Sequence, residues 1–328
     1  MKRFLLRRSA AAIVLLLLLT LIVFVLQTIS PGDPVKASLG ANASPAAVAA
    51  ERERLGLNDP VIVRYVRFVG DAVQGDLGTS LRTHRPVMDD LRDFLPATVE
   101  LVGMAFLIAL LMAILFAFSG ALRWPGGGAY RTLLLVGATA PPFLLGLGGI
   151  ILFYSQLGWL PASGRGPDDA GPTGLLVLDS LLHGNLADAN DALKHLLLPA
   201  AVLAIAPAIA IGRIFRSSIE TTVRADHVRT ARSKGLTERD VLSRHVVRNA
   251  LNPALSMAGL QLGFIFAGVV VVEQVFSWAG IGNYLASSIQ VSDFPAIAGV
   301  TLILGAVYIV SNAVVDILQV VVDPRIEN

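Results

Sequence analysis

The chain has 328 residues, of which 54% are hydrophobic and only 15% are charged, with a net charge of +2 and no cysteine. Soluble domains carry about 25% charged residues, so this composition indicates a membrane protein. The small net charge gives no reason to expect a nucleic-acid partner, and the lack of cysteine excludes disulfides, thiol catalysis and cysteine-ligated metals.

The N-terminus has a short basic leader followed by an apolar stretch. Residues 1–8 contain four basic side chains, and residues 9–28 contain no charge. Twenty helical residues are enough to cross about 30 Å of hydrocarbon. A cleaved signal peptide would have a shorter apolar region, of about 7–15 residues, and a small-residue cleavage site, which this stretch lacks. The sequence therefore predicts an uncleaved first span within residues 1–29.

Residues 30–96 are soluble in character and are longer than a simple connection between two spans. Ser44–Pro45 is typical of a helix start, and Asp59–Pro60 repeats the pattern. Apolar residues on one face continue the second of these helices to Gly75, and residues 86–95 read as a third short helix. We expect a small helical, extracytoplasmic insertion between the first and second spans.

Five further apolar segments are long enough to cross a bilayer. Counted from the N-terminus, the third span is interrupted by Pro141–Pro142, which a membrane helix tolerates only beside protein or a cavity. The fifth contains Gly259 and Gly263 at a spacing that permits close helix contact. Within a core at residues 97–328, these five spans lie near 99–118, 132–156, 195–214, 253–272 and 297–315.

The distribution of basic residues predicts the orientation. With the N-terminus in the cytoplasm, 16 of the 26 Lys and Arg residues fall on the cytoplasmic side and 10 outside. Eight of those ten lie in residues 30–96, a segment longer than the ~60 residues over which the positive-inside rule is reliable. We therefore predict an all-α polytopic protein of the cell membrane, with six transmembrane helices and both termini in the cytoplasm.

Several polar and aromatic residues lie near the predicted span ends. We expect headgroups to solvate Glu100, Glu273 and Asp316, and we expect Trp159 and Trp278 to be anchors at the outer surface. Two amides lie within spans, Gln261 and Asn312. They are candidates for lining a transport pathway, although hydrogen bonds between helices are the commoner role of such residues.

Other classes of function lack their usual signals. None of the four lysines lies in a G-x-x-x-x-G-K-[ST] phosphate loop, and neither H-E-x-x-H nor G-x-S-x-G occurs. We therefore expect no catalytic residue, no metal site and no cofactor in this chain. A stand-alone channel or secondary transporter is the alternative class, but a secondary transporter would be expected to show a mid-span carboxylate and an inverted repeat.

The polar segment at residues 216–252 reads as two short helices separated by a glycine. Gly235 suits the left-handed position after a helix, and Thr237 with Asp240 is close to a capping box. Asp240 and Arg244 form an acid-before-base pair four residues apart. An ordinary basic loop that only fixes topology needs neither these caps nor the apolar faces of both helices. We interpret the segment as a docking surface for another protein.

The run RTARSKGLTERDVLSRHVVRNALNP resembles the EAA-type loop of importer-type ABC permeases, in the form of the dipeptide/oligopeptide/nickel group. Ala231 and Gly235 match the general motif, while Arg229, Thr230 and Arg248 depart from it toward the peptide-group form. Shorter motifs extend the resemblance over essentially the whole chain: PGDP at 31–34, LGL at 55–57, GDLGTS at 75–80, VEQVF at 272–276, GIG at 280–282 and DPR at 323–325.

The resemblance implies a type I ABC importer permease fold and a permease subunit that is not itself an enzyme. It further implies a heterodimer with a second homologous permease chain, two cytoplasmic ATPases that carry ATP and Mg, and an extracytoplasmic binding protein. Di- or oligopeptides are the expected substrates, with nickel, glutathione or oligosaccharides as alternatives within the family. The residues implied in coupling to the ATPase are Arg229, Thr230, Ala231, Arg232, Lys234, Gly235 and Leu236, supported by Asp240, Arg244, His245, Arg248, Asn249 and Pro253.

Overall fold

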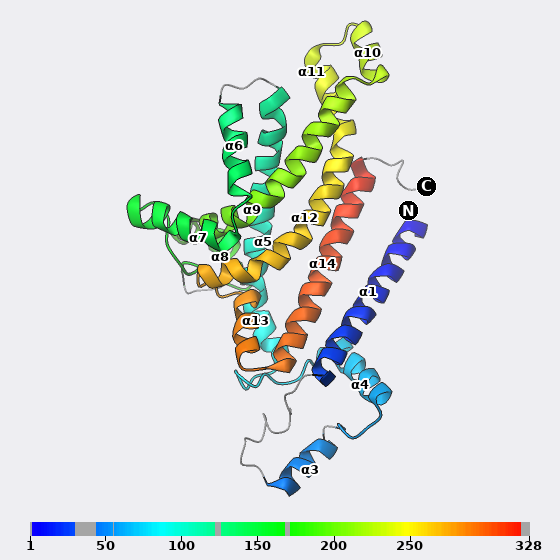
Figure 1. The fold of residues 1–328 in the computed structure, drawn as a ribbon, viewed down its shortest axis with the longest axis vertical. Coiled ribbons are helices and arrows are strands. Elements are labelled where there is room, and N and C mark those ends of the chain that lie inside the picture. The colour runs from blue at the N-terminus through cyan, green and yellow to red at the C-terminus, as the bar shows by residue number, and fades with distance from the viewer. Residues whose placement is uncertain (1, 30–43, 55, 122–125, 168–170, 323–328) are drawn as a thin grey trace. The chain divides into compact units, whose positions relative to one another are not determined.

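The computed structural model describes residues 2–29, 44–54, 56–121, 126–167 and 171–322, and these residues form helices joined by turns and loops (Figure 1). The chain divides into two units. The larger unit contains Pro96–Gly282 and Tyr308–Asn328, and the smaller unit contains Lys2–Leu95 and Asn283–Val307. Residues 283–307, which we had assigned to the core, therefore group with the N-terminal residues.

The helices follow one another along the whole chain, and two of the segments are π-helices (η). In order they are α1 (Lys2–Ile29), α3 (Pro45–Arg54), α4 (Val61–Val73), α5 (Val87–Ala121), α6 (Gly127–Gly137), α7 (Pro142–Gly149), η1 (Ile150–Gln156), α8 (Leu176–Leu182), α9 (Leu186–Val223), α10 (Asp226–Ser233), α11 (Glu238–Asp240), η2 (Val241–Val247), α12 (Arg248–Val275), α13 (Ile281–Gln290) and α14 (Phe294–Val322).

Five helical segments of the described chain are each long and apolar enough to cross a membrane. They are Ala10–Ile29, Val87–Ser119, Leu186–Val223, Glu238–Val275 and Phe294–Val315. A sixth candidate is a bent pair, in which α6 meets α7 and η1 at an angle of 117°.

The predicted span at 132–156 is therefore not one straight helix. Pro141 precedes α7 and Pro142 is among its first residues. Neither has the backbone N–H that a continuous helix requires, and the ladder breaks there.

Two further predictions of helix boundaries are wrong. Residues 86–95 do not form a separate short helix, because α5 continues through Pro96, and Pro253 lies inside α12 instead of starting it. An internal proline removes one backbone hydrogen bond, which favourable packing can offset. Leu91 and Ala97, on either side of Pro96, are both fully buried.

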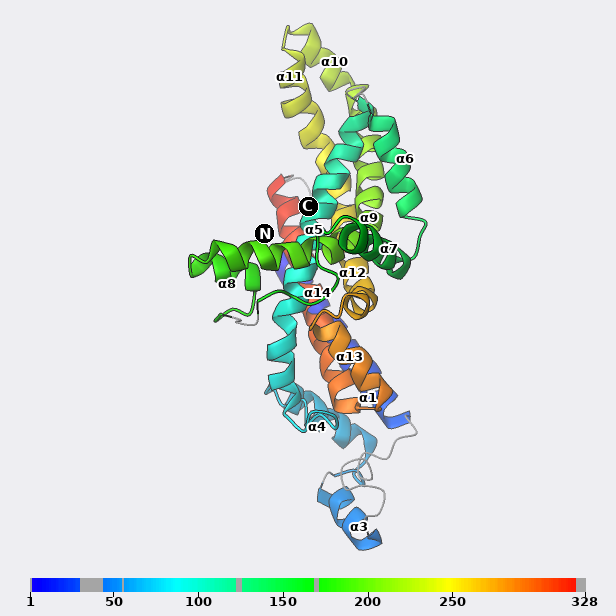
Figure 2. The same cartoon turned by 90° about the vertical axis from the view of Figure 1, so that its left-hand side faces the viewer.

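Within the larger unit, the long helices pack closely through small residues. A Cβ atom added at Gly259 would lie 3.0 Å from Val315 Cγ1, and one added at Gly263 would lie 2.6 Å from Tyr308 Cε2. The predicted close contact at these glycines is confirmed, and it joins α12 to the last part of α14 in antiparallel fashion. On the other side of α12, α9 packs along it (Figures 1 and 2).

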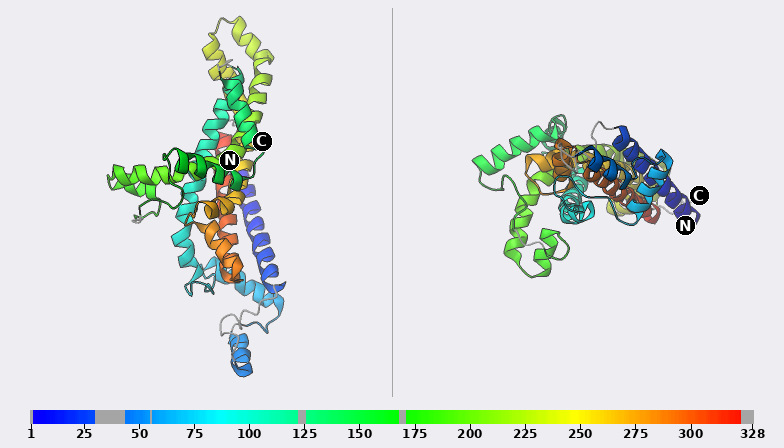
Figure 3. Two further views of the ribbon diagram at one scale, coloured as in Figure 1. Left: turned by 60° about the vertical axis from the view of Figure 1, so that its left-hand side comes forward. Right: turned by 90° about the horizontal axis from the view of Figure 1, so that it is seen from below.

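The larger unit has two distinguishable ends. At one end α5 stops, α6 begins, and α10 and α11 connect α9 to α12 (Figures 1 and 2). The opposite end holds the start of the unit at Pro96 and the end of α12 at Val275. Between the ends, α8 and the first turns of α9 project sideways from the unit (Figures 2 and 3).

Candidate functional site

The segment that joins α9 to α12 forms a compact projection, which we call the knob (Asp226–Val247). Its first helix, α10, ends at Ser233 and is followed at Gly235 by a left-handed φ of +78°. The Gly235 N–H donates to Arg232 O at 2.9 Å, and the Leu236 N–H donates to Ala231 O at 3.4 Å. The predicted left-handed glycine is confirmed, and it turns the chain sharply from α10 into α11.

The second half of the knob starts with the predicted cap. Thr237 Oγ1 accepts a hydrogen bond from the Asp240 N–H at 3.2 Å and donates to Asp240 Oδ2 at 2.7 Å. Arg244 Nε lies 3.4 Å from Asp240 Oδ1, so the predicted ion pair is present. The structure adds a pair that we did not predict, in which Arg232 Nε and Nη2 donate to the Glu238 carboxylate at 2.9 and 3.2 Å. This pair spans the Gly235 turn, and its spacing of six residues matches no single-helix rule.

The apolar faces of the knob point inward, contrary to our prediction that they contribute to a docking surface. Val228, Val241 and Val246 are fully buried and Ala231 is nearly so. They pack in one cluster with Phe215 of α9 and with apolar residues of α5 and α12. Short helices gain most of their stability from burial of an apolar face, so this packing helps to hold the angle between α10 and the second half of the knob. The hydrophobic core of the spans therefore continues into the knob.

The outer surface of the knob is polar and basic. Of the seven residues implied in coupling, Ala231 is buried and the other six are exposed. Arg229 has a side chain that is 75% exposed, and Leu236 is 40% exposed. Among the supporting residues, Arg248, Asn249 and Pro253 are exposed, while His245 is half-buried and accepts a hydrogen bond at its carbonyl from Asn249 Nδ2 at 2.6 Å.

A cavity of about 300 Å³ lies at the bend between α6 and α7. Its walls are mostly apolar and include Ala140 and Pro142 from the bend, Val202 from α9, and Gln261 and Phe264 from α12. The double proline therefore lies beside a cavity, as the physics of membrane helices requires. Gln261 brings an amide to this cavity, and its Nε2 donates to Met257 Sδ at 3.5 Å within the same helix.

The other predicted pathway residue does not line this cavity. Asn312 lies on α14, where its Nδ2 donates to Tyr308 O at 3.1 Å. Its Oδ1 would lie 3.5 Å from a Cβ added at Gly259. The structure therefore brings Gln261, and not Asn312, to the cavity.

At the opposite end of the larger unit lies a buried carboxylate that the sequence did not reveal. Glu273 is fully buried, and Thr98 Oγ1 donates to its Oε1 at 2.5 Å. Thr98 Oγ1 in turn accepts the Ile281 N–H at 2.8 Å. A Cβ added at Gly280 would overlap the Glu273 carboxylate, and one added at Gly282 would lie 2.7 Å from the Val270 backbone. The two glycines of the GIG motif thus form a cradle that admits the Glu273 side chain.

Glu100 and Trp278 belong to the same buried layer. Glu100 Oε2 lies 2.8 Å from Arg165 Nη2, and the side chains of this pair are 9% and 15% exposed. Trp278 is 1% exposed, donates from Nε1 to Ala97 O at 3.0 Å, and has the Arg165 guanidinium over its ring.

Our predictions that headgroups solvate Glu100 and Glu273 and that Trp278 is a surface anchor are therefore wrong. Hydropathy locates the end of a span but does not say which side chains a folded-back loop covers. Trp159 is 64% exposed, in keeping with an anchor, and the side chain of Asp316 lies outside the described residues. Within the described part of the chain, no group of three or more His, Asp or Glu side chains is arranged to hold a metal ion.

Comparison with protein families identifies the class of membrane protein to which these features belong. Residues 105–328 match the model of the binding-protein-dependent transport system inner membrane component, and residues 1–102 match the N-terminal model of the same membrane component. The chain belongs to this family. It is a multi-pass inner membrane protein and the permease subunit of an ABC importer.

Named relatives cover the permease from end to end. It is 41% identical over 313 residues to the probable D,D-dipeptide transport system permease protein DdpB of Escherichia coli, covering 93% of this chain and 92% of that protein. It is 37% identical to the dipeptide transport system permease protein DppB of Alkalihalophilus pseudofirmus, over the full length of both chains. It is 33% identical to the glutathione transport system permease protein GsiC of Salmonella paratyphi A, over 99% of each.

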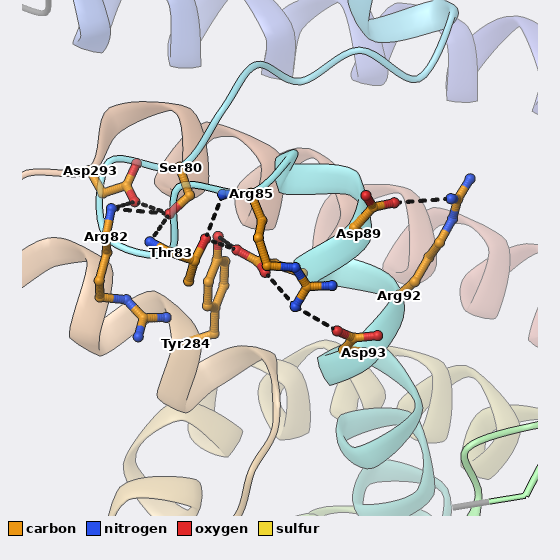
Figure 4. A network of polar contacts seen from close by, with 10 residues as sticks. Ser80, Arg82, Thr83, Arg85, Asp89, Arg92, Asp93, Tyr284 and Asp293 are labelled. Carbon is orange, nitrogen blue, oxygen red and sulfur yellow. Dashed lines mark hydrogen bonds and ion pairs between the residues drawn. The ribbon is translucent and has the colours of Figure 1, made fainter. Parts of the chain in front are cut away.

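The smaller unit of the permease contains a polar network that gives the GDLGTS motif a structural role (Figure 4). Gly78 has a left-handed φ of +82° and lies against Pro295. This turn at Gly78 directs the chain toward Ser80. Ser80 Oγ donates to Asp293 Oδ2 at 2.5 Å, and Asp293 Oδ1 accepts the Ala296 N–H at 3.3 Å at the start of α14. The motif therefore fastens the loop before α5 to the first turn of α14.

Asp90 forms the second centre of this network. It is fully buried, and its Oδ2 accepts hydrogen bonds from Thr83 Oγ1 at 2.5 Å and from Tyr284 OH at 2.9 Å. Arg85 Nη1 lies 3.3 Å from the other carboxylate oxygen. Phe94 stacks on Tyr284 with ring centroids 5.1 Å apart. Sequence inspection missed this network, since Tyr284 lies 194 residues from its partner.

Proposed function

We propose that the permease imports di- or oligopeptides and that its knob transmits movement from a partner ATPase to the transport pathway. The peptide substrate is supported by the relatives, since the two with 41% and 37% identity are named for dipeptide transport. Glutathione is the second candidate, because a relative with 33% identity over nearly full length is named for it. Nickel and oligosaccharides stay alternatives from the sequence resemblance alone.

One observation carries the proposed mechanism: the knob connects directly to two of the helices that line the cavity. It follows α9, which contributes Val202, and it leads into α12, which contributes Gln261. Its buried side chains form one cluster with residues of both helices. Because close-packed interiors transmit displacement instead of absorbing it, a force on the knob would move α9 and α12 together.

The exposed surface of the knob has the chemistry of a polar docking site. Arg229 and Lys234 are both exposed and basic, and Leu236 adds an exposed apolar side chain next to the Gly235 turn. This combination suits a groove on the ATPase with an apolar floor and acidic rim. In the complete importer, a second homologous permease would form the rest of the pathway, two ATPases would bind the two knobs, and a binding protein would deliver peptide from outside.

ATP hydrolysis would take place in the partner chains. The sequence of the permease has no phosphate loop of the G-x-x-x-x-G-K-[ST] type, so the ATP and Mg required for transport would be bound by the ATPases. Closure of the ATPase pair around ATP would draw the two knobs together and switch the pathway between outward and inward openings.

The test is charge reversal on the knob of the importer reconstituted in liposomes with all its partners. We expect Arg229→Glu with Lys234→Glu to abolish ATP-dependent peptide uptake and to release the ATPases from the membrane. The matched control is Arg92→Glu, which also reverses an exposed charge, since the Arg92 side chain is 73% exposed in the smaller unit. Uptake unchanged by the double reversal would contradict the coupling role, and peptide transport by the permease alone would favour a channel or secondary transporter.

A further inference from the structure

The helix α4 (Val61–Val73) has an apolar stripe that no part of the described chain covers. Among its 13 residues, all of which the structure describes, none is buried. Ile62, Val66 and Val73 lie on one side of the helix at 78%, 64% and 83% exposure. Arg67 and Asp71 lie on the opposite side. At 3.6 residues per turn, both positions are about a third to a half of a turn away from the stripe. The helix is thus strongly amphipathic, and its stripe has no partner among the residues that the structure describes.

The rest of the apolar face of α4 is attached to the membrane span α1. Tyr65 OH donates to Leu17 O at 3.1 Å and lies 3.0 Å from Thr20 Oγ1. The ring of Phe24 contacts the rings of Tyr65 and Phe68, with centroids 5.4 and 5.9 Å apart. These contacts fix the position of α4 along α1.

The contacts place α4 beside the C-terminal half of α1, toward the end of the candidate span at Ile29. Phe24 lies five residues before Ile29, the end of the candidate span, and at 1.5 Å per residue that is about 7.5 Å along the helix. Leu17 lies 12 residues before the same end, or about 18 Å. Helices that lie in the membrane interface bury their apolar face about 5–10 Å below the headgroup boundary. The depth of Phe24 falls in that range, and Leu17, which the end of the long Tyr65 side chain reaches, lies deeper.

We propose that α4 is an interfacial membrane helix, with Ile62, Val66 and Val73 inserted among acyl chains. It lies in the leaflet that holds the C-terminal end of α1, which is the outer leaflet under the predicted orientation. The neighbouring helix α1 also has exposed apolar side chains, among them Leu21 and Val25 at 43% and 41% exposure.

The charged residues of α4 fit this placement. Arg64 lies with its guanidinium 5.9 Å from the centroid of the Phe24 ring, and Arg67 pairs with Asp59 at 2.6 Å. Arginine on the polar face is typical of helices at the headgroup level, where its side chain can reach phosphate oxygens. The insertion is therefore part membrane-bound, and not wholly soluble as its composition suggested.

The test uses nitroxide labels on the importer in liposomes without its binding protein. The native chain has no cysteine, so each single substitution gives one labelling site in this chain, which is labelled before it is assembled with its partners. The stripe variants are Ile62→Cys, Val66→Cys and Val73→Cys, and the matched control on the polar face is Asp71→Cys. All four positions are exposed, so substitution does not remove a buried side chain. Oxygen concentrates in the hydrocarbon, whereas a water-soluble nickel chelate does not enter it.

We expect relaxation by oxygen to exceed relaxation by the nickel chelate at all three stripe positions, and the reverse at Asp71→Cys. Two results would overturn the proposal. Greater access of the nickel chelate to the stripe would mean that it faces water, as a docking site for the binding protein would. Low access of both reagents would mean that a protein subunit covers it. None of these readings depends on which substrate the importer carries.

Discussion

Thr98 Oγ1 donates a 2.5 Å hydrogen bond to Glu273 Oε1, although the two residues are 175 positions apart in the sequence. The bond joins the part of α5 that opens the larger unit to the last turn of α12. The same hydroxyl accepts the Ile281 N–H at 2.8 Å, so one side chain organises both the carboxylate and the loop that covers it.

Replacement of Thr98 by valine should destabilise the permease by about 1–3 kcal/mol, because a buried polar partner loses a hydrogen bond. The measurement is thermal unfolding of the purified permease in detergent. Thr98→Ser keeps the hydroxyl and should unfold close to the native temperature. Thr139→Val is the control, because it removes an exposed hydroxyl that donates only to the nearby Val136 carbonyl. Equal stability of Thr98→Val and Thr139→Val would contradict a structural role for the Thr98–Glu273 bond.

Replacement of Gly235 by valine should cost about 1–2 kcal/mol in the turn of the knob, since a β-branched residue is strained at a φ of +78°. The space around the position is open, because no described atom lies within 4 Å of an added Cβ. Backbone strain is therefore the whole effect. Asparagine tolerates the left-handed region, so Gly235→Asn should keep peptide uptake while Gly235→Val lowers uptake per ATP hydrolysed. Loss of uptake in both variants would point to a contact made at Gly235 by the ATPase.

Replacement of Gln261 by tryptophan should fill part of the 300 Å³ cavity and reduce peptide transport. Gln261 lies on α12 outside the knob, and the caps of the knob are local, so binding of the ATPases should be retained. Asn312→Leu removes an amide that does not line this cavity and serves as the control. Uptake and ATPase activity measured on the same liposomes separate the two effects. Full transport by Gln261→Trp would exclude this cavity from the pathway.

Burial raises the pKa of Tyr284, and its hydrogen bond to Asp90 raises it further against an opposing effect of Ser80. The neutral phenol is thus favoured in the folded protein. The raised pKa of Tyr284 contributes fully to the stability of the folded protein below the ordinary tyrosine pKa of about 10. This contribution is lost as the pH rises above that value, because the unfolded protein then releases the phenol proton more readily. We expect the unfolding temperature of the native permease to fall more steeply above about pH 10 than that of Tyr284→Phe. Tyr154→Phe, at an exposed position, should retain the native slope.

The features that could be read from the sequence are those whose partners are neighbours in the chain. Gly235 and the Thr237–Asp240 cap lie within six residues, and their geometry follows from local backbone rules. Long apolar runs likewise gave the spans, apart from the bend that two adjacent prolines introduce between α6 and α7.

The missed features depend on partners far apart in sequence. Ser80 and Asp293 are 213 residues apart, and hydropathy cannot pair them. Glu273 and Trp278 lie at a span end, where a position facing headgroups and a position covered by a loop have the same composition. The inward faces of the knob were misjudged for a related reason: periodicity identifies an apolar face but not what that face contacts.

The cradle of Gly280 and Gly282 has a consequence for how this segment can evolve. A methyl group at position 280 and a carboxylate at position 273 would occupy the same space. A methyl group at position 280 would also lie 2.5 Å from Thr98 Oγ1, so alanine there requires changes at both Glu273 and Thr98. Alanine at position 282 would meet the Val270 backbone whatever the acid. Positions 98, 273 and 280 should therefore change together across related permeases or not at all.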